Sequence, residues 1–138
     1  MRDPSQEILK AAVNFLNIVY DGETIPVTTT YQQQDFYIVV SVPSIPIDDG
    51  TNDGAIYDLT LRIEAVTEFL TDEQRDTVSN KIMEQITEQI NKDSFNVYLT
   101  GFEVVLINFG SLDRETQQDN TSNIIIKRKD FTLKVAET

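Results

Sequence analysis

Hydrophobic and polar residues alternate most regularly between positions 57 and 65. The apolar residues are Tyr57, Leu59, Leu61, Ile63 and Ala65, and the polar residues between them are Asp58, Thr60, Arg62 and Glu64. A period of two is typical of a β-strand that buries one side and exposes the other. The pattern therefore predicts a strand whose odd-numbered side chains face the core and whose even-numbered side chains face water.

A second alternation covers residues 36–42. Here Phe36, Ile38, Val40 and Val42 are interleaved with Tyr37, Val39 and Ser41. This predicts a strand with one face more deeply buried, which the prolines at 43 and 46 bring to an end. Upstream, Ile25-Pro26-Val27 predicts an extended segment that Pro26 confines to a sheet edge or to the beginning of a strand.

Two segments show helical spacing instead. The first starts at Asp3-Pro4-Ser5-Gln6 and places Ile8, Ala11, Ala12, Phe15 and Leu16 on one face. The second starts at Thr71-Asp72-Glu73-Gln74, a capping box, and repeats Val78, Ile82, Ile86 and Ile90 every four residues, with Met83 beside them. We therefore expect an N-terminal helix that packs on a sheet and a long central helix over residues 72–91.

The last third of the chain alternates less clearly. Val97, Leu99 and residues 102–109 predict a strand or a hairpin, and residues 110–123 predict a long polar loop. In the final strand, residues 124–135, the apolar residues change parity, which predicts a bulge near residues 127–130. With a further long loop at residues 43–54, the sequence predicts one α+β domain over residues 1–138, with an antiparallel sheet packed by the two helices.

The composition narrows the possible functions. Twenty-three acidic residues face 11 basic ones, for a net charge of −12, and there is no His, Cys or Trp. The common general base, the nucleophilic thiol and the usual transition-metal ligands are therefore missing, so we expect no enzyme and no cofactor. The acidity argues against binding to nucleic acids and anionic membranes. The N-terminus does not have the pattern of a signal peptide, and no apolar run approaches about 18 residues, so we expect synthesis in the cytoplasm.

Two carboxylate groupings invite a chemical interpretation. Asp58 and Glu64 lie on one strand face but six residues apart, about 20 Å at roughly 3.3 Å per residue, which is too far for joint attack on one bond. Residues 48–54, which include Asp48 and Asp49, have the oxygen-rich composition of a calcium loop. The twelfth position is Leu59 or Thr60 rather than Glu, so we expect an ordinary solvated turn and no metal.

Lys127, Arg128 and Lys129 form a local basic cluster in this acidic chain. In an extended segment, Lys127 and Lys129 share one face and Arg128 points to the other. One interpretation is that these residues protect a strand edge against unwanted pairing. The other is a docking contact for an acidic neighbour, which could be an identical subunit.

The order and spacing of these elements resemble the small tail-completion, or tail-terminator, proteins of tailed bacteriophages. The resemblance covers residues 5–135 and rests on the block Tyr57-Asp58-Leu59-Thr60-Leu61-Arg62-Ile63, the capped helix, Gly101-Phe102-Glu103-Val104 and the closing segment 124–133. It is a likeness of pattern with no diagnostic short motif. The long loop at residues 43–54 and the acidity depart from the family.

The resemblance implies a structural virion protein, assembled in the host cytoplasm, that forms a ring of six at the head–tail joint. Its partners would be further copies of itself, the tail tube and the connector or neck proteins, and DNA would pass through the lumen without sequence-specific binding. The two polar loops, with Asp48, Asp49, Thr116, Gln117 and Gln118, would serve as interface arms beside the basic cluster. The alternatives are a neck or connector ring protein of the portal vertex, a calcium-dependent binding module on residues 48–53 and, ranked last, a small hydrolase.

Overall fold

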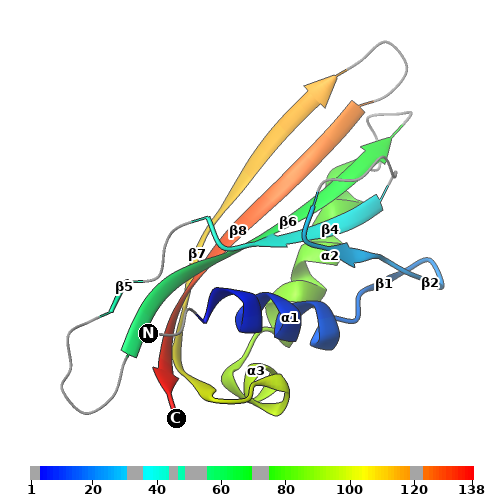
Figure 1. Cartoon of the computed structure of the whole chain (residues 1–138). Coiled ribbons are helices and arrows are strands. Elements are labelled where there is room, and N and C mark those ends of the chain that lie inside the picture. The colour runs from blue at the N-terminus through cyan, green and yellow to red at the C-terminus, as the bar shows by residue number, and fades with distance from the viewer. Residues whose placement is uncertain (1–3, 31–35, 44–46, 49–55, 70–74, 119–122) are drawn as a thin grey trace.

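The computed structural model describes residues 4–30, 36–43, 47–48, 56–69, 75–118 and 123–138. Along the chain the elements are α1 Ser5–Phe15, β1 Val19–Tyr20, β2 Glu23–Thr24, β3 Val27–Thr28, β4 Phe36–Ser41, β5 Ile47–Asp48, β6 Ile56–Phe69, α2 Arg75–Gln89, α3 Lys92–Tyr98, β7 Phe102–Gln118 and β8 Asn123–Glu137. This arrangement is the predicted α+β fold with an N-terminal helix (Figure 1).

The main sheet has the strand order β3-β4-β6-β8-β7, and β5 pairs with β6 beyond the end of β4. Its pairings are antiparallel except for one. Val27 pairs with Ile38 and Thr28 with Val39 in parallel, so the predicted antiparallel sheet carries one parallel pairing, at β3. The expectation that the segment around Pro26 lies at a sheet edge is confirmed, because β3 is the first strand of this order.

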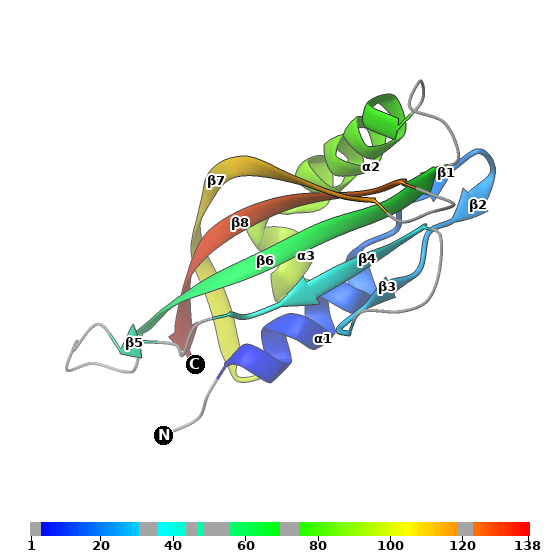
Figure 2. The same cartoon turned by 90° about the horizontal axis from the view of Figure 1, so that it is seen from above.

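All three helices pack against the same face of the sheet, and the main core lies between them (Figure 2). The helix faces predicted from spacing are confirmed: the core includes Ile8, Ala11 and Ala12 of α1, and Val78, Ile82, Met83 and Ile86 of α2. The start proposed for the second helix, residues 72–74, lies outside the described residues. The strands β6, β7 and β8 are long and twisted, and the sheet that they form extends beyond the end of α2 (Figure 1).

Helix α3 was not predicted, because the sequence around Val97 and Leu99 indicated a strand. Its first turn is capped by Asn91, whose side chain accepts a hydrogen bond from the backbone N–H of Ser94 at 2.8 Å. Phe95 is fully buried and meets Phe15 of α1 edge to face, with 4.8 Å between ring centroids. Packing against α1, which is distant in the sequence, therefore stabilises this short helix.

The predicted polar loop at residues 110–123 is wrong for most of its length. Strand β7 continues to Gln118 and pairs with β8, which begins at Asn123. Backbone pairing with β8 stabilises this segment although its sequence is polar. The structure also describes Ile47 and Asp48 of the other predicted loop as strand β5.

The predicted bulge in β8 is also wrong, because β8 pairs with β6 without interruption from Asn123 to Ala136. The register irregularities lie instead in β7, between Val104 and Leu106 and between Phe109 and Leu112. The change of parity in β8 has another cause. Ile126 joins a second small cluster on the opposite face of the sheet, with Tyr37, Val39 and Val66, and Ile124 packs against it.

Candidate functional site

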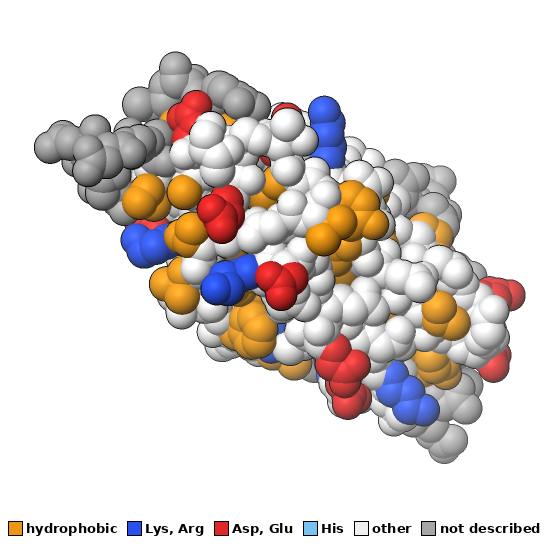
Figure 3. Space-filling model, turned by 90° about the horizontal axis from the view of Figure 1, so that it is seen from below, with side chains coloured by type: hydrophobic (Ala, Val, Ile, Leu, Met, Phe, Trp, Pro, Cys, Tyr) orange, Lys and Arg blue, Asp and Glu red, His pale blue; other side chains and the backbone are white. Residues whose placement is uncertain are grey.

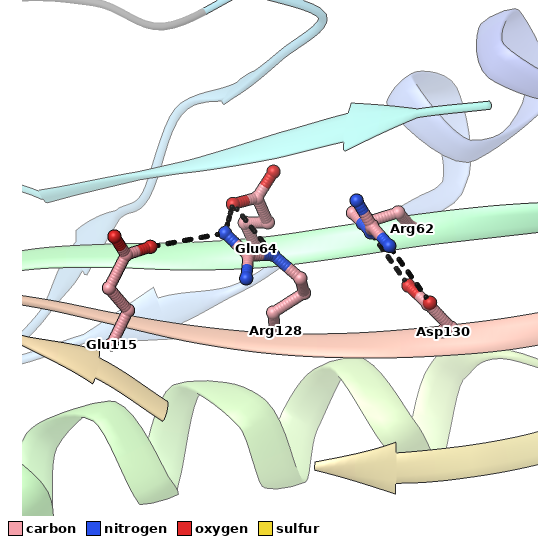
Figure 4. A network of polar contacts seen from close by, with 5 residues as sticks. All are labelled: Arg62, Glu64, Glu115, Arg128 and Asp130. Atoms are coloured by element: carbon pink, nitrogen blue, oxygen red, sulfur yellow. Dashed lines mark hydrogen bonds and ion pairs between the residues drawn. The ribbon is translucent and has the colours of Figure 1, made fainter. Parts of the chain in front are cut away.

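Charged side chains of β6 and β8 face each other on the side of the sheet opposite the helices (Figure 4). Arg62 pairs in register with Asp130, and its Nε and Nη2 donate to the two carboxylate oxygens at 2.9 and 3.2 Å. This bidentate hydrogen bond, opposed by partial desolvation, raises the pKa of the Arg62 guanidinium. The guanidinium of Arg62 therefore keeps its positive charge beside the carboxylate.

The neighbouring pair runs in the opposite direction across the same two strands. Arg128 donates from Nη2 and Nε to Glu64 Oε2 at 2.9 and 3.2 Å, and from Nη2 to Glu115 Oε2 of β7 at 3.3 Å. The side chain of Glu64 is only 4% exposed, so the prediction that this position faces water is wrong. Arg128 instead lies between two carboxylates and connects three strands.

This arrangement can hold strands in register, because Asp130, Glu64 and Glu115 each lie against an arginine of a neighbouring strand. Asp58, a further acidic residue of β6 on this face, pairs with Lys134 of β8 at 3.0 Å. Within the described ranges, no group of three or more acidic side chains could hold a metal ion. The chemistry of this face is therefore that of cross-strand ion pairs.

The basic cluster at residues 127–129 divides between the two faces of the sheet, as an extended segment requires. Lys127 is 5% exposed and donates to Asn80 Oδ1 of α2. Lys129 Nζ lies 3.5 Å from Thr87 Oγ1 of α2 and 5.3 Å from the ring centroid of Phe109. Both lysines thus point to the helices, whereas Arg128 points away from them.

These positions change the interpretation of the cluster. Strand β8 lies between β6 and β7, so protection of a sheet edge is wrong as an explanation. The three basic side chains all make contacts within the subunit, and they do not form one surface for an acidic neighbour. Reversing them to Glu would therefore act on folding as well as on any assembly.

The other predicted interface residues lie at two separate places. Asp48 pairs with Tyr57 through the backbone at the far end of β6, and Asp49 lies outside the described residues. Thr116, Gln117 and Gln118 form the end of β7 and pair with residues 125, 124 and 123 of β8. The structure does not bring these two groups together.

The surface that sequence reasoning missed is on β7, the last strand of the sheet order. Four large apolar side chains of this strand are 39 to 54% exposed, and we call them the apolar edge: Val105, Leu106, Phe109 and Leu112. A groove of about 270 Å³ lies between β7 and the end of α2, lined by three of them together with Ile90, Lys92 and Ile107. The signals in the sequence were the adjacent Val105-Leu106 and the isolated Leu112 within a polar segment.

Charges of both signs are interspersed with hydrophobic side chains on the face that is seen from below (Figure 3). None of the helices in the described part of the chain is long and apolar enough to cross a membrane. Comparison of the sequence with protein-family models and with curated proteins gave no match.

Proposed function

We propose that this protein is a structural virion subunit that forms a ring at the head–tail joint of a tailed bacteriophage, as a tail-terminator or tail-completion protein. The observation that carries the proposal is the apolar edge. An exposed edge strand with large hydrophobic side chains is a hazard for a protein that stays monomeric, and a natural contact for one that assembles. The resemblance of the sequence pattern to tail-terminator proteins is the reason for placing the ring at the head–tail joint.

The ion pairs support a structural role. Cross-strand pairs on β6, β7 and β8 stiffen the long strands on the face that carries no helix among the described residues. A subunit that transmits contacts around a ring needs such a rigid platform. The net charge of −12 suits a lumen through which DNA passes, because an acidic wall does not bind phosphate.

The partners of the ring in this proposal are further copies of the chain, the tail tube and the connector or neck proteins. The test is to purify the protein and measure its mass by light scattering, with negative-stain imaging of the same sample. Annular particles of uniform mass, with six as the expected number of subunits, support the proposal. A monomer at every concentration up to the millimolar range, with no particles in the images, overturns it.

A neck or connector ring protein is the alternative, and particles assembled without this protein separate the two. A subunit that caps the tail tube limits tail growth, so its absence should leave unjoined tails of irregular length. A subunit that closes the portal retains DNA, so its absence should leave tails of normal length and empty heads. The second outcome would replace our proposal with the neck protein.

A further inference from the structure

A short acidic hairpin stands at the side of the sheet away from β7. Val19 and Tyr20 of β1 pair with Thr24 and Glu23 of β2. The turn between the strands consists of Asp21 and Gly22, which both have positive φ angles, 52° and 78°. Two such residues form the tight turn that matches the twist of a hairpin. The hairpin is held to α2 by Gln85, whose side-chain amide accepts from the backbone N–H of Val19 at 3.0 Å and donates to its carbonyl at 2.8 Å.

The hairpin presents one apolar and two acidic side chains. Val19 is 41% exposed, and Asp21 and Glu23 are exposed. Because its backbone is clamped to α2, the hairpin is ordered before any partner arrives, which lowers the entropic cost of binding.

The groove beside the apolar edge has the complementary character. Val105, Leu106 and Phe109 supply its apolar wall, and Lys92, the first residue of α3, supplies a positive charge at its rim. Lys92 is exposed, and the described residues include no ion-pair partner for it. By contrast, Arg62 of β6 and Arg128 and Lys134 of β8 form ion pairs within the subunit.

The hairpin and the groove lie at opposite edges of the sheet. The hairpin leads directly into β3, the first strand of the sheet order, whereas the groove is on β7, the last strand. Both views of the molecule show the β1–β2 hairpin and β7 on different sides (Figures 1 and 2). One copy therefore cannot fill its own groove with its own hairpin.

We infer that the acidic hairpin of one copy docks in the apolar groove of the next copy, with Glu23 beside Lys92 and Val19 against Leu106. The inference rests on the proposed function for its choice of a second copy as the occupant. A contact between two different surfaces of identical subunits is heterologous, and such contacts close into rings when the rotation between subunits allows it. The opposite charges of the two surfaces set the orientation of the contact.

A hairpin tip buries less than the roughly 1,200 Å² of a standard interface, so one such contact holds two copies weakly. In a closed ring each subunit makes the contact twice, once with its hairpin and once with its groove. Closure therefore stabilises the assembly beyond the pairwise affinity, since the last contact forms within one particle.

The test is a charge exchange across the contact, read out by light scattering as the concentration at which half of the protein is assembled. Lys92→Glu and Glu23→Lys should each raise that concentration about tenfold or more, which corresponds to about 1.4 kcal/mol. The double variant should return to within about threefold of the wild type, because the pair is restored with its signs exchanged. Matched controls carry the same charge changes on exposed positions of α2: Lys81→Glu and Glu88→Lys should leave assembly unchanged.

The apolar part of the contact has its own pair of variants. Leu106→Asn should weaken assembly, whereas Val97→Asn, which changes a 78% exposed residue of α3 outside the groove, should not. Circular dichroism and denaturant melts of each variant show whether the subunit is still folded.

Two results lead to different conclusions. If the wild type forms rings and the charge variants and Leu106→Asn form them equally well, the hairpin-in-groove contact is wrong and the proposed function stands. If the wild type forms no assembly under any condition, the proposed function is overturned together with the contact.

Discussion

Replacement of Arg128 by Met should destabilise the subunit strongly, because it removes the guanidinium that lies against the buried carboxylate of Glu64. The side chain of Glu64 is 4% exposed and receives two hydrogen bonds from Arg128. Loss of one partner from a buried ion pair costs about 3 to 5 kcal/mol. Arg128 is itself 25% exposed, so water can replace part of the interaction, and we expect a loss of about 2 to 4 kcal/mol in the free energy of unfolding.

The neighbouring pair provides a matched control on the same face of the same strands. Arg62 and Asp130 are 34% and 38% exposed, so solvent screens the pair and accommodates Asp130 once the guanidinium is gone. Arg62→Met should therefore cost less than about 1 kcal/mol. The two variants make the identical substitution, and the pairs differ in direction and above all in the burial of the acid.

Urea denaturation followed by circular dichroism, with linear extrapolation, measures both losses. A third variant, Glu64→Leu with Arg128→Met, removes both charges and should recover most of the stability lost in Arg128→Met alone. Equal losses for Arg128→Met and Arg62→Met would show that burial of Glu64 does not control the energetics of this face. The same conclusion would follow if the Glu64→Leu, Arg128→Met double variant were no more stable than Arg128→Met alone.

Three further changes test other parts of the fold in the same assay. Ile82→Ala removes a buried side chain of α2 and should lower the free energy of unfolding by about 2 to 5 kcal/mol. Glu84→Ala, on the exposed face of the same helix, should change it by less than about 0.5 kcal/mol. Similar values for the two variants would mean that the buried face of α2 is wrongly assigned. Gly110→Ala would put a Cβ 2.6 Å from a backbone carbonyl oxygen of β8 and should cost about 1 to 3 kcal/mol, with Ser111→Ala as the silent neighbour. Asn91→Ala removes the cap of α3 and should cost about 0.5 to 2 kcal/mol, and no loss would place the stability of α3 in its packing alone.

The periodicity of hydrophobic residues correctly predicted the helices and strands that bury one face and expose the other. The odd-numbered residues of β6 and the four-residue repeat of α2 face the same core, so each pattern carries its own structural information. Helix α3 has no such pattern over its seven residues. Its one fully buried residue, Phe95, packs on Phe15 from the other end of the chain, and a contact of that range leaves no local signal in the sequence.

The second half of strand β7, beyond Phe109, escaped prediction for two physical reasons. β7 is an edge strand with a polar second half, and the composition of such a strand is close to that of a loop. Its two register irregularities also change which face successive residues occupy, once after Val104 and again after Phe109, and this hides the alternation. The sequence did not predict that Val105, Leu106 and Phe109 are exposed, because their exposure depends on which strand lies at the end of the sheet.

The charged face could be anticipated only in part. The sequence showed that Arg62 and Glu64 share a strand face, but not that β8 places an opposite charge in register with each of them. Pairing between residues more than 60 positions apart depends on the topology of the sheet. The same register places Lys127 and Lys129 under α2, which removes them from the surface where we expected a docking contact.

The balance of charges in the proposed ring leads to a last prediction, on ionic strength. Six subunits would carry six times −12, which is −72, while the inferred contact brings together a single pair of opposite charges per interface. Repulsion between whole subunits acts over a longer distance than the attraction between Glu23 and Lys92. Salt shortens the screening length from about 30 Å at 0.01 M to about 8 Å at 0.15 M, and therefore weakens the long-range repulsion most. Assembly measured by light scattering should therefore become stronger over this range. A steady weakening with salt would mean that ionic contacts, rather than the apolar edge, hold the subunits together.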